Sequence, residues 1–250
     1  MAKTFYYDSE GLLEATINDG TYSGSSWSND TSITNEERLV DQSIATAASG
    51  IGNADALKIT FTASKTLDFI AVYFSASESD NLALYREVST DSYTSIKAMT
   101  ATFSAGWTVG EFSGAAGTNW HLASTSGVIA NLTEFIVGQK LEFEMNPDIG
   151  MGESESFNTE VNTSIGGIEY AVKVGDPRTT ISMSFSSVSS TFKDNLQSME
   201  AQVQDYKKFL YSENGTTGPF HYVRLDKPID FKEVSYQRYS CSINLVEQLS

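Results

Sequence analysis

The stretch SSTFKDNLQSMEAQVQDYKKFLYSENG, residues 189–215, carries the clearest periodic pattern in this sequence. Its apolar residues recur at steps of three and four, which predicts one apolar stripe along an amphipathic α-helix. We expect Ser189 or Ser190 to cap the start of this helix and Asn214-Gly215 to end it. The predicted packing stripe consists of Phe192, Leu196, Met199, Val203, Tyr206 and Leu210.

The segment before this helix alternates in the manner of a β-strand. In TTISMSFSSV, residues 179–188, Ile181, Met183 and Phe185 fall on one face. An apolar sheet face needs a cover, and the helical stripe can supply it. We therefore predict a small antiparallel sheet covered by one helix, with further strands at 165–174, 219–225 and 231–249.

The earlier part of the chain has many short apolar segments separated by turn-rich ones, which predicts an antiparallel β-sandwich of jelly-roll type. The composition changes around NPDIGMGESESFN, residues 146–158. We predict a sandwich domain at 1–146, a linker at 147–158 and a sheet-plus-helix domain at 159–250, to which residues 1–20 can add a strand. The fold class is mainly β. The predicted sandwich strands are 57–63, 67–76, 82–88, 93–103, 106–112, 120–124 and 134–145.

The composition limits the kinds of partner. The chain of 250 residues has a net charge of −16, and its first 150 residues carry 19 acidic against 7 basic side chains. An acidic surface repels phosphate and anionic lipid, so we expect neither sequence-specific nucleic acid nor a membrane as a partner. No apolar run is long enough to cross a bilayer, and no secretory signal is evident.

The sequence contains no recognisable catalytic set. It lacks the glycine, serine and histidine motifs of the common hydrolases and nucleotide-binding proteins. We expect Cys241 to be a small buried apolar residue, His121 a hydrogen-bonded strand residue, and His221 a surface residue. Glu142 and Glu144 are interpreted as a solvated sheet face, although paired carboxylates can hydrolyse glycosides. We predict no catalytic residues, no metal site, no cofactor and no enzymatic activity.

Four aromatic residues stand beside glycine, serine and asparagine in the first domain. Such residues in polar loops can stack on the face of a sugar ring. Tyr22, Trp27, Trp107 and Trp120 are therefore candidate glycan-binding residues. The alternative is that these rings fill the ends of the sandwich core, which is the stronger interpretation because large aromatic side chains are usually buried.

The second domain, about 159–249, resembles the ring-forming parts of tailed-phage distal tail proteins and related minor tail proteins. The resemblance lies in the order of its features: the alternating strand TTISMSFSSV, the helix FKDNLQSMEAQVQDYKKFLY, the strand beginning PFHYV and the alternating end YQRYSCSINLVEQL. It covers roughly the last two-fifths of the chain and rests on a pattern, without a signature motif.

This resemblance implies a non-enzymatic virion protein, made in the host cytoplasm and built into the tail. It would form a hexameric or trimeric ring in a distal-tail or baseplate position and link the tail tube to the tip or fibres. The implied partners are further copies of itself, other tail proteins and host surface glycan. The alternative, from the loop aromatic residues, is a carbohydrate-binding module or adhesin-like protein. A hydrolase with a degenerate site is a third, less favoured, interpretation.

Overall fold

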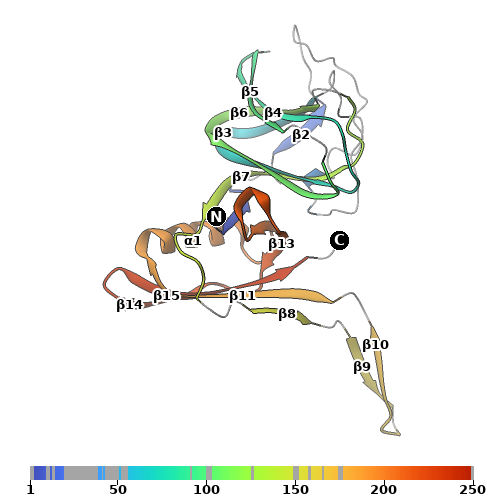
Figure 1. Ribbon diagram of the computed structural model, residues 1–250, viewed down its shortest axis with the longest axis vertical. Helices are drawn as coiled ribbons and strands as arrows, with labels where there is room; N and C mark the ends of the chain where they lie inside the picture. The colour runs from blue at the N-terminus through green and yellow to red at the C-terminus, as the bar shows by residue number, and fades with distance from the viewer. Residues whose placement is uncertain are drawn as a thin grey trace.

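The computed structural model describes residues 3–9, 12, 15–19, 39–40, 42, 51, 56–90, 92–99, 103–124, 127–148, 152–156, 159–164, 166–173 and 177–248. In these residues the chain forms antiparallel sheets and one α-helix, which confirms the predicted mainly β fold class. Figure 1 shows two units stacked along the long axis of the molecule. The sandwich unit contains β2 to β7, and the helix unit contains β1, α1 and β8 to β15.

The sandwich unit is built on two long strands. Strand β3 pairs along most of its length with β6, and its second half also pairs with β7. Among the described residues, 20 buried ones form the core of this unit, and they include Trp120, Phe74 and Phe135. Its strands are β2 (Thr16–Asp19), β3 (Ala56–Phe74), β4 (Leu82–Ser89), β5 (Ser92–Met99), β6 (Gly106–Ser124) and β7 (Leu132–Glu142).

In two places, a pair of consecutive predicted strands in this unit forms one long strand with an irregular middle. The predicted strands 57–63 and 67–76 form the one strand β3, and 106–112 and 120–124 form β6. The pairing register between β3 and β6 shifts twice, after Thr60 and after Leu67. Bulges of this kind bend a strand without ending it, which explains why the turn-rich GAAGTN did not mark a boundary.

The helix unit continues the same sheet. From β7 of the sandwich unit the strands continue in the order β1-β12-β13-β15-β11-β8, and β14 pairs with β15. Strand β1 pairs with both β7 and β12, so it joins the two units. The elements are β1 (Thr4–Tyr7), β8 (Gly152–Ser156), β11 (Arg178–Ser189), α1 (Ser190–Val203), β12 (Phe209–Ser212), the 3₁₀ turn η3 (Gly215–Thr217), β13 (Phe220–Leu225), β14 (Asp230–Ser235) and β15 (Arg238–Glu247).

The helix α1 covers one face of this sheet, as predicted. Ser189 is its N-cap, and the Ser189 hydroxyl accepts a hydrogen bond from the Phe192 backbone N–H at 3.1 Å. The carboxylate of Glu144 in turn accepts from the Ser189 backbone N–H and hydroxyl. Glu144 therefore belongs to the helix cap, which corrects its interpretation as part of a solvated sheet face. The buried helix residues share one core with Ile181, Met183 and Phe185.

The helix is shorter than its apolar stripe. Phe192, Leu196, Met199 and Val203 are buried as predicted, but the helix ends at Val203 and Gln204 has a φ of 51°. Tyr206 lies beyond the helix and is 57% exposed, and Leu210 is buried in strand β12. The prediction that these two residues pack as part of the helix is wrong.

The boundary between the units differs from the predicted one. The predicted linker at 147–158 contains β8, which pairs with β11 from Gly152 opposite Ser182 to Ser156 opposite Arg178. The strand expected at 165–174 is β10 (Glu169–Lys173), which pairs only with β9 (Thr159–Thr163) among the described residues. As expected, the beginning of the chain adds a strand, β1, to the helix unit. Within the described residues no helix has the length and apolar character that crossing a bilayer requires.

Candidate functional site

A two-stranded arm projects from the helix unit. It consists of β9 and β10 and extends the pair formed by β8 and β11, away from the rest of the molecule (Figure 1). Every residue in the two strands is exposed. Gly167, with a φ of 77°, forms the turn at the tip, where the backbones of Ser164 and Ile168 also hydrogen-bond. A hairpin with no core of its own is marginally stable in water, so this arm is a candidate for contact with a partner.

Strand β10 and the residue before it carry apolar side chains on one face of the arm. Ile168, Tyr170 and Val172 alternate along the chain and therefore share a face, and they are 59%, 54% and 55% exposed. Val161 lies opposite Ala171 on the other face and is 56% exposed. Large apolar side chains that gather on a projecting element mark contact surfaces more strongly than single exposed residues do.

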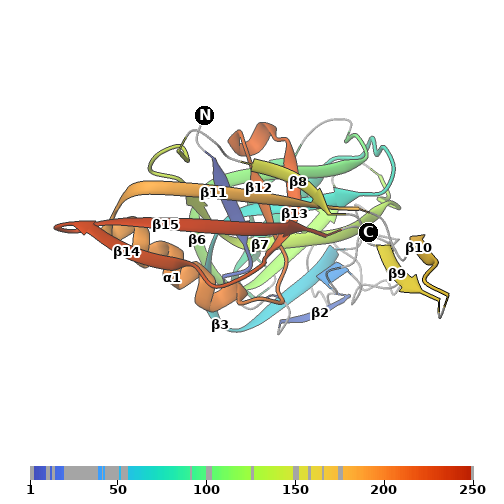
Figure 2. The same cartoon turned by 90° about the horizontal axis from the view of Figure 1, so that it is seen from below.

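A second exposed hairpin lies at the other end of the same unit. Strands β14 and β15 meet in a tight turn at Tyr236 and Gln237, where Gln237 has a φ of 55°. Tyr236 is 85% exposed and Val234 50%. Figure 2 shows this hairpin and the arm pointing in opposite directions. Strands β8 and β14 each have one strand partner among the described residues, so each presents a sheet edge nearby.

The outer face of the helix-unit sheet carries small hydroxyl side chains. Ser184 and Ser242 face one another with their oxygens 3.5 Å apart, and the Ser182 hydroxyl donates to Asn244 Oδ1 at 3.0 Å. A groove of about 530 Å³ opens on this face. It is lined by Asp148, Ser184, Phe185, Ser186, Lys227, Pro228, Asp230, Phe231, Lys232, Ser240, Cys241 and Ser242.

The structure describes two of the four candidate glycan-binding residues, Trp107 and Trp120. Tyr22 and Trp27 lie outside the described residues. Trp120 is fully buried, and its indole N–H donates to the Gly117 carbonyl, so it fills the core and offers no stacking face. Trp107 is partly buried between Tyr73 and Tyr222, where the two units meet.

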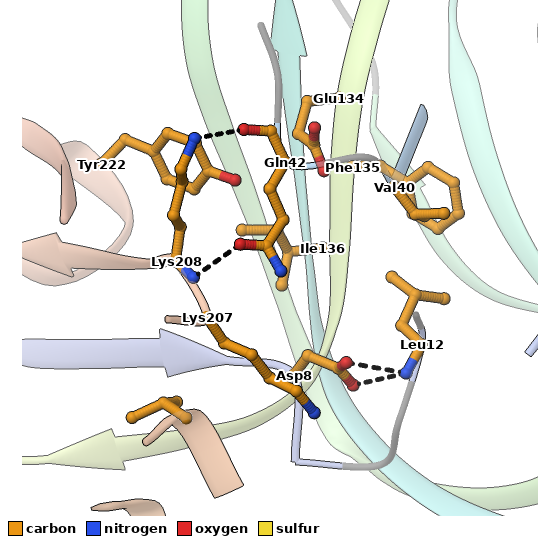
Figure 3. Close-up of a pocket in the computed structure, with 11 residues that line it drawn as sticks. Asp8, Leu12, Val40, Gln42, Glu134, Phe135, Ile136, Lys207, Lys208 and Tyr222 are labelled. Atoms are coloured by element: carbon orange, nitrogen blue, oxygen red, sulfur yellow. Dashed lines mark hydrogen bonds between the residues drawn. The ribbon is translucent and has the colours of Figure 1, made fainter. Parts of the chain in front are cut away.

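A small cavity also lies where the two units meet (Figure 3). Its volume of about 20 Å³ leaves room for about one water molecule and none for a sugar ring. Gln42 closes one side: its side-chain carbonyl accepts from the Lys208 backbone N–H, and its backbone carbonyl accepts from Lys208 Nζ. The Lys208 ammonium also lies 5.6 Å from the centre of the Tyr222 ring. This cavity therefore forms part of the joint between the units.

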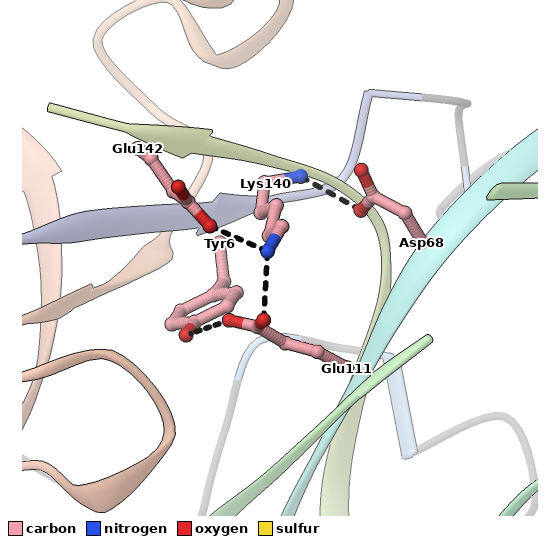
Figure 4. Close-up of polar contacts among 5 residues, drawn as sticks. All are labelled: Tyr6, Asp68, Glu111, Lys140 and Glu142. Carbon is pink, nitrogen blue, oxygen red and sulfur yellow. Dashed lines mark hydrogen bonds and ion pairs between the residues drawn. The ribbon is translucent and has the colours of Figure 1, made fainter. Parts of the chain in front are cut away.

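A polar network holds the other side of the joint (Figure 4). The Tyr6 hydroxyl donates to Glu111 at 2.6 Å, and Lys140 Nζ donates to Glu111 at 2.7 Å and to Glu142 at 2.5 Å. Burial raises the pKa of Asp68 to about 6, although its carboxylate accepts from the Lys140 backbone N–H. The charged side chains of Glu111, Lys140 and Glu142 are all paired with one another, and Asp68 accepts a backbone hydrogen bond. We therefore interpret the network as structural.

The two histidines and the single cysteine differ in their surroundings. His121 is fully buried, and burial lowers its pKa to about 3, with Lys58 adding to the effect. Cys241 is buried as predicted, and burial raises its pKa to about 11, which leaves the thiol unreactive at neutral pH. His221 is mostly covered and lies beside Glu247, whose hydrogen bond raises the pKa of His221. The alternation in PFHYVRL predicts a surface position for His221, but it contains no sign of these carboxylates, which come from other strands.

Comparison with known proteins assigns no family. No family model and no curated protein matches the chain. Similar solved structures include a chitosan-binding module of a Paenibacillus sp. IK-5 chitosanase/glucanase, with 13% identity, a TM-score of 0.38, and coverage of 51% of this chain and 97% of the module. The CBM32-1 domain of a Clostridium perfringens family 31 glycoside hydrolase has 10% identity, a TM-score of 0.39, and coverage of 53% and 100%.

A further similar structure is CpGH89 from Clostridium perfringens, solved with its substrate GlcNAc-α-1,4-galactose. It has 9% identity and a TM-score of 0.41, and the match covers 52% of this chain but only 14% of that one. With identities and TM-scores this low, these comparisons attribute neither a ligand nor an activity to the present chain.

Proposed function

We propose that this chain is a non-enzymatic structural subunit of a tailed-phage virion, which assembles into a distal-tail or baseplate ring and links the tail tube to the tip or fibres. One observation carries the proposal. Exposed apolar residues gather on two hairpins that point in opposite directions from one unit: the arm with Tyr170 and Val172, and the β14–β15 turn with Val234 and Tyr236.

This placement favours a head-to-tail arrangement of identical copies. A subunit that presents different surfaces at its two ends makes heterologous contacts, and such contacts close into a ring when the rotation per subunit allows it. Strand β14 belongs to the second hairpin and β8 leads into the arm. Within the described residues each of them has one strand partner, so each leaves a sheet edge for pairing across subunits. The order of strand, helix and strands, which resembles distal tail proteins, supplies the virion context for the proposal.

Light scattering over a concentration series tests the proposal. We expect the purified chain to form a trimer or hexamer, and we expect the double variant Tyr170→Ser/Val172→Ser to lower this mass to that of a monomer. Val161→Ser is the matched control, because Val161 is as exposed as Val172 but lies on the opposite face of the arm. A chain that stays monomeric at every concentration, alone and with a tail-tube protein, contradicts the proposal.

Carbohydrate binding is a second candidate function, and one observation favours it. The groove on the outer face of the helix-unit sheet combines serine hydroxyls with the carboxylates of Asp148 and Asp230. Hydroxyls and carboxylates that converge in one groove suit a polyhydroxylated ligand. Retention on glycan affinity gels that is lost in Asp230→Ala supports this candidate, and the absence of binding to every glycan on an array removes it.

A further inference from the structure

One imidazole in the helix unit is surrounded by carboxylates from three separate elements. His221 lies on β13, Glu153 on β8 and Glu247 on β15, while Glu213 directly follows β12. Ligand atoms of Glu153, Glu213 and His221 all lie within 4.8 Å of one another. Strands β12, β13 and β15 are neighbours in the sheet, and the fold also brings Glu153 of β8 close to them. The residues come from positions up to 94 residues apart, so no local sequence motif reveals the cluster.

The two nitrogens of this imidazole have different roles. Nδ1 lies 3.4 Å from the Glu247 carboxylate, which holds the ring in place. Nε2 lies 3.9 Å from Glu213 Oε1, beyond hydrogen-bond distance. This nitrogen is buried and has no hydrogen-bond partner. A buried polar atom without a partner is unfavourable, so this nitrogen is suited to a ligand that the cluster itself attracts.

The charges of the cluster indicate what that ligand is. Three carboxylates surround a single imidazole, so the cluster carries a net negative charge even when the imidazole is protonated. A bound cation would balance this charge and would also satisfy the buried nitrogen. A metal-binding histidine typically presents its second ring nitrogen to a carboxylate, as His221 does to Glu247.

We propose that His221 Nε2, Glu213 and Glu153 bind a Zn²⁺ ion, with Glu247 orienting the imidazole. One nitrogen and two carboxylate ligands suit zinc better than calcium or magnesium, which prefer sets made only of oxygen. Donors about 2.1 Å from a tetrahedral zinc lie roughly 3.4 Å apart. The ligand atoms lie 3.9 Å apart for His221 and Glu213 and within 4.8 Å for the whole set, so zinc binding requires the three side chains to draw together. Three protein ligands leave one position for water.

The site has a mechanical consequence. Glu153 belongs to β8, the edge strand from which the arm extends, whereas His221 lies on β13 and Glu213 directly follows β12. In the described pairing β8 has hydrogen bonds only to β11, so the ion would give this edge a second attachment. This inference does not depend on the proposed ring, because zinc binding is measured on the chain in any oligomeric state.

The test is a calorimetric titration of the chelator-treated chain with Zn²⁺, with Ca²⁺ and Mg²⁺ titrated separately for comparison. We expect one zinc per chain, a rise in the melting temperature on binding, and a tetrahedral cobalt spectrum when Co²⁺ replaces zinc. His221→Ala and Glu153→Gln should each weaken zinc binding at least tenfold. Glu155→Gln is the matched control, because Glu155 is an exposed carboxylate two residues along the same strand but outside the cluster.

Two results would overturn the proposal: a chain that takes up less than half an equivalent of zinc, or equal zinc affinity in Glu153→Gln and Glu155→Gln. Glu153 is exposed, so its substitution should leave the fold intact even when a change at His221 does not. The Glu153→Gln comparison therefore decides the question if His221→Ala fails to fold.

Discussion

His121 determines part of the acid response of this protein, because its side chain has no exposed surface. Its folded pKa is about 3, below the 6.5 of an unfolded histidine, so the unfolded chain binds the proton first. Its contribution to stability is therefore complete above pH 6.5 and is lost as the pH falls below that value. We expect wild type to lose about 2 kcal/mol of unfolding free energy between pH 7 and pH 5 relative to His121→Gln.

Urea unfolding of both proteins at the two pH values measures this difference. Other titrating groups are shared by wild type and variant, so they cancel in the comparison. An identical stability gap at pH 7 and pH 5 would show that the His121 imidazole does not resist protonation in the folded chain.

Tyr6 links the two units through a single hydroxyl. Its hydrogen bond to Glu111 is 2.6 Å long, and this carboxylate is also paired with Lys140. A hydrogen bond to a charged group contributes about 1.5 kcal/mol or more, so Tyr6→Phe should lower the unfolding free energy by about this amount. Tyr236→Phe is the control for loss of a hydroxyl, since Tyr236 is 85% exposed. Equal stability of the two variants contradicts the assigned role of Tyr6.

At the scale of the element, α1 depends on how its apolar side chains are buried. Leu196 lies in the middle of the stripe and is fully buried against the sheet. Truncation of a buried leucine leaves a cavity, and Leu196→Ala should cost about 3 kcal/mol of unfolding free energy. Gln197→Ala is the exposed control on the next position and should change stability by less than about 0.5 kcal/mol. Denaturant unfolding of the three proteins measures both effects.

The same helix shows how far local pattern can predict this fold. Local sequence pattern correctly predicts the cap at Ser189, the four buried residues of the stripe and the strand residues that the helix covers. Tyr206 and Leu210 continue the periodicity although the chain has already left the helix. Leu210 is buried because β12 pairs with β1, about 200 residues earlier, and no local pattern contains that information.

The candidate site residues also divide into those that local sequence pattern predicts and those that depend on contacts between distant parts of the chain. Trp120 stands among polar neighbours in the sequence, but it pairs with Ile59 of β3 and is fully buried in the sandwich core. The arm face of Tyr170 and Val172 could have been read from their alternation, yet their exposure depends on the absence of a covering layer among the described residues. The cluster around His221 forms only through the sheet order.

For the whole molecule, we expect cooperative unfolding because β1 connects the two units. It pairs with β7 on one side and β12 on the other, and Phe5 belongs to the core of the helix unit while Tyr6 packs between the units. We expect a single transition in urea, with coincident curves from tryptophan fluorescence, which includes Trp107 and Trp120, and from the helical circular-dichroism signal of α1. Two separated transitions would show that β1 does not couple the units.

The central position of β1 also determines the order in which the two units can fold during translation. During translation this strand leaves the ribosome before either neighbour exists: β7 is complete only at Glu142, and β12 only at Ser212. Until then its backbone groups remain open to pairing with other strands, a known route to aggregation of nascent chains. The helix unit must therefore close late, and a ribosome that stalls shortly before Phe209 would hold a chain with a finished sandwich unit and an incomplete helix unit.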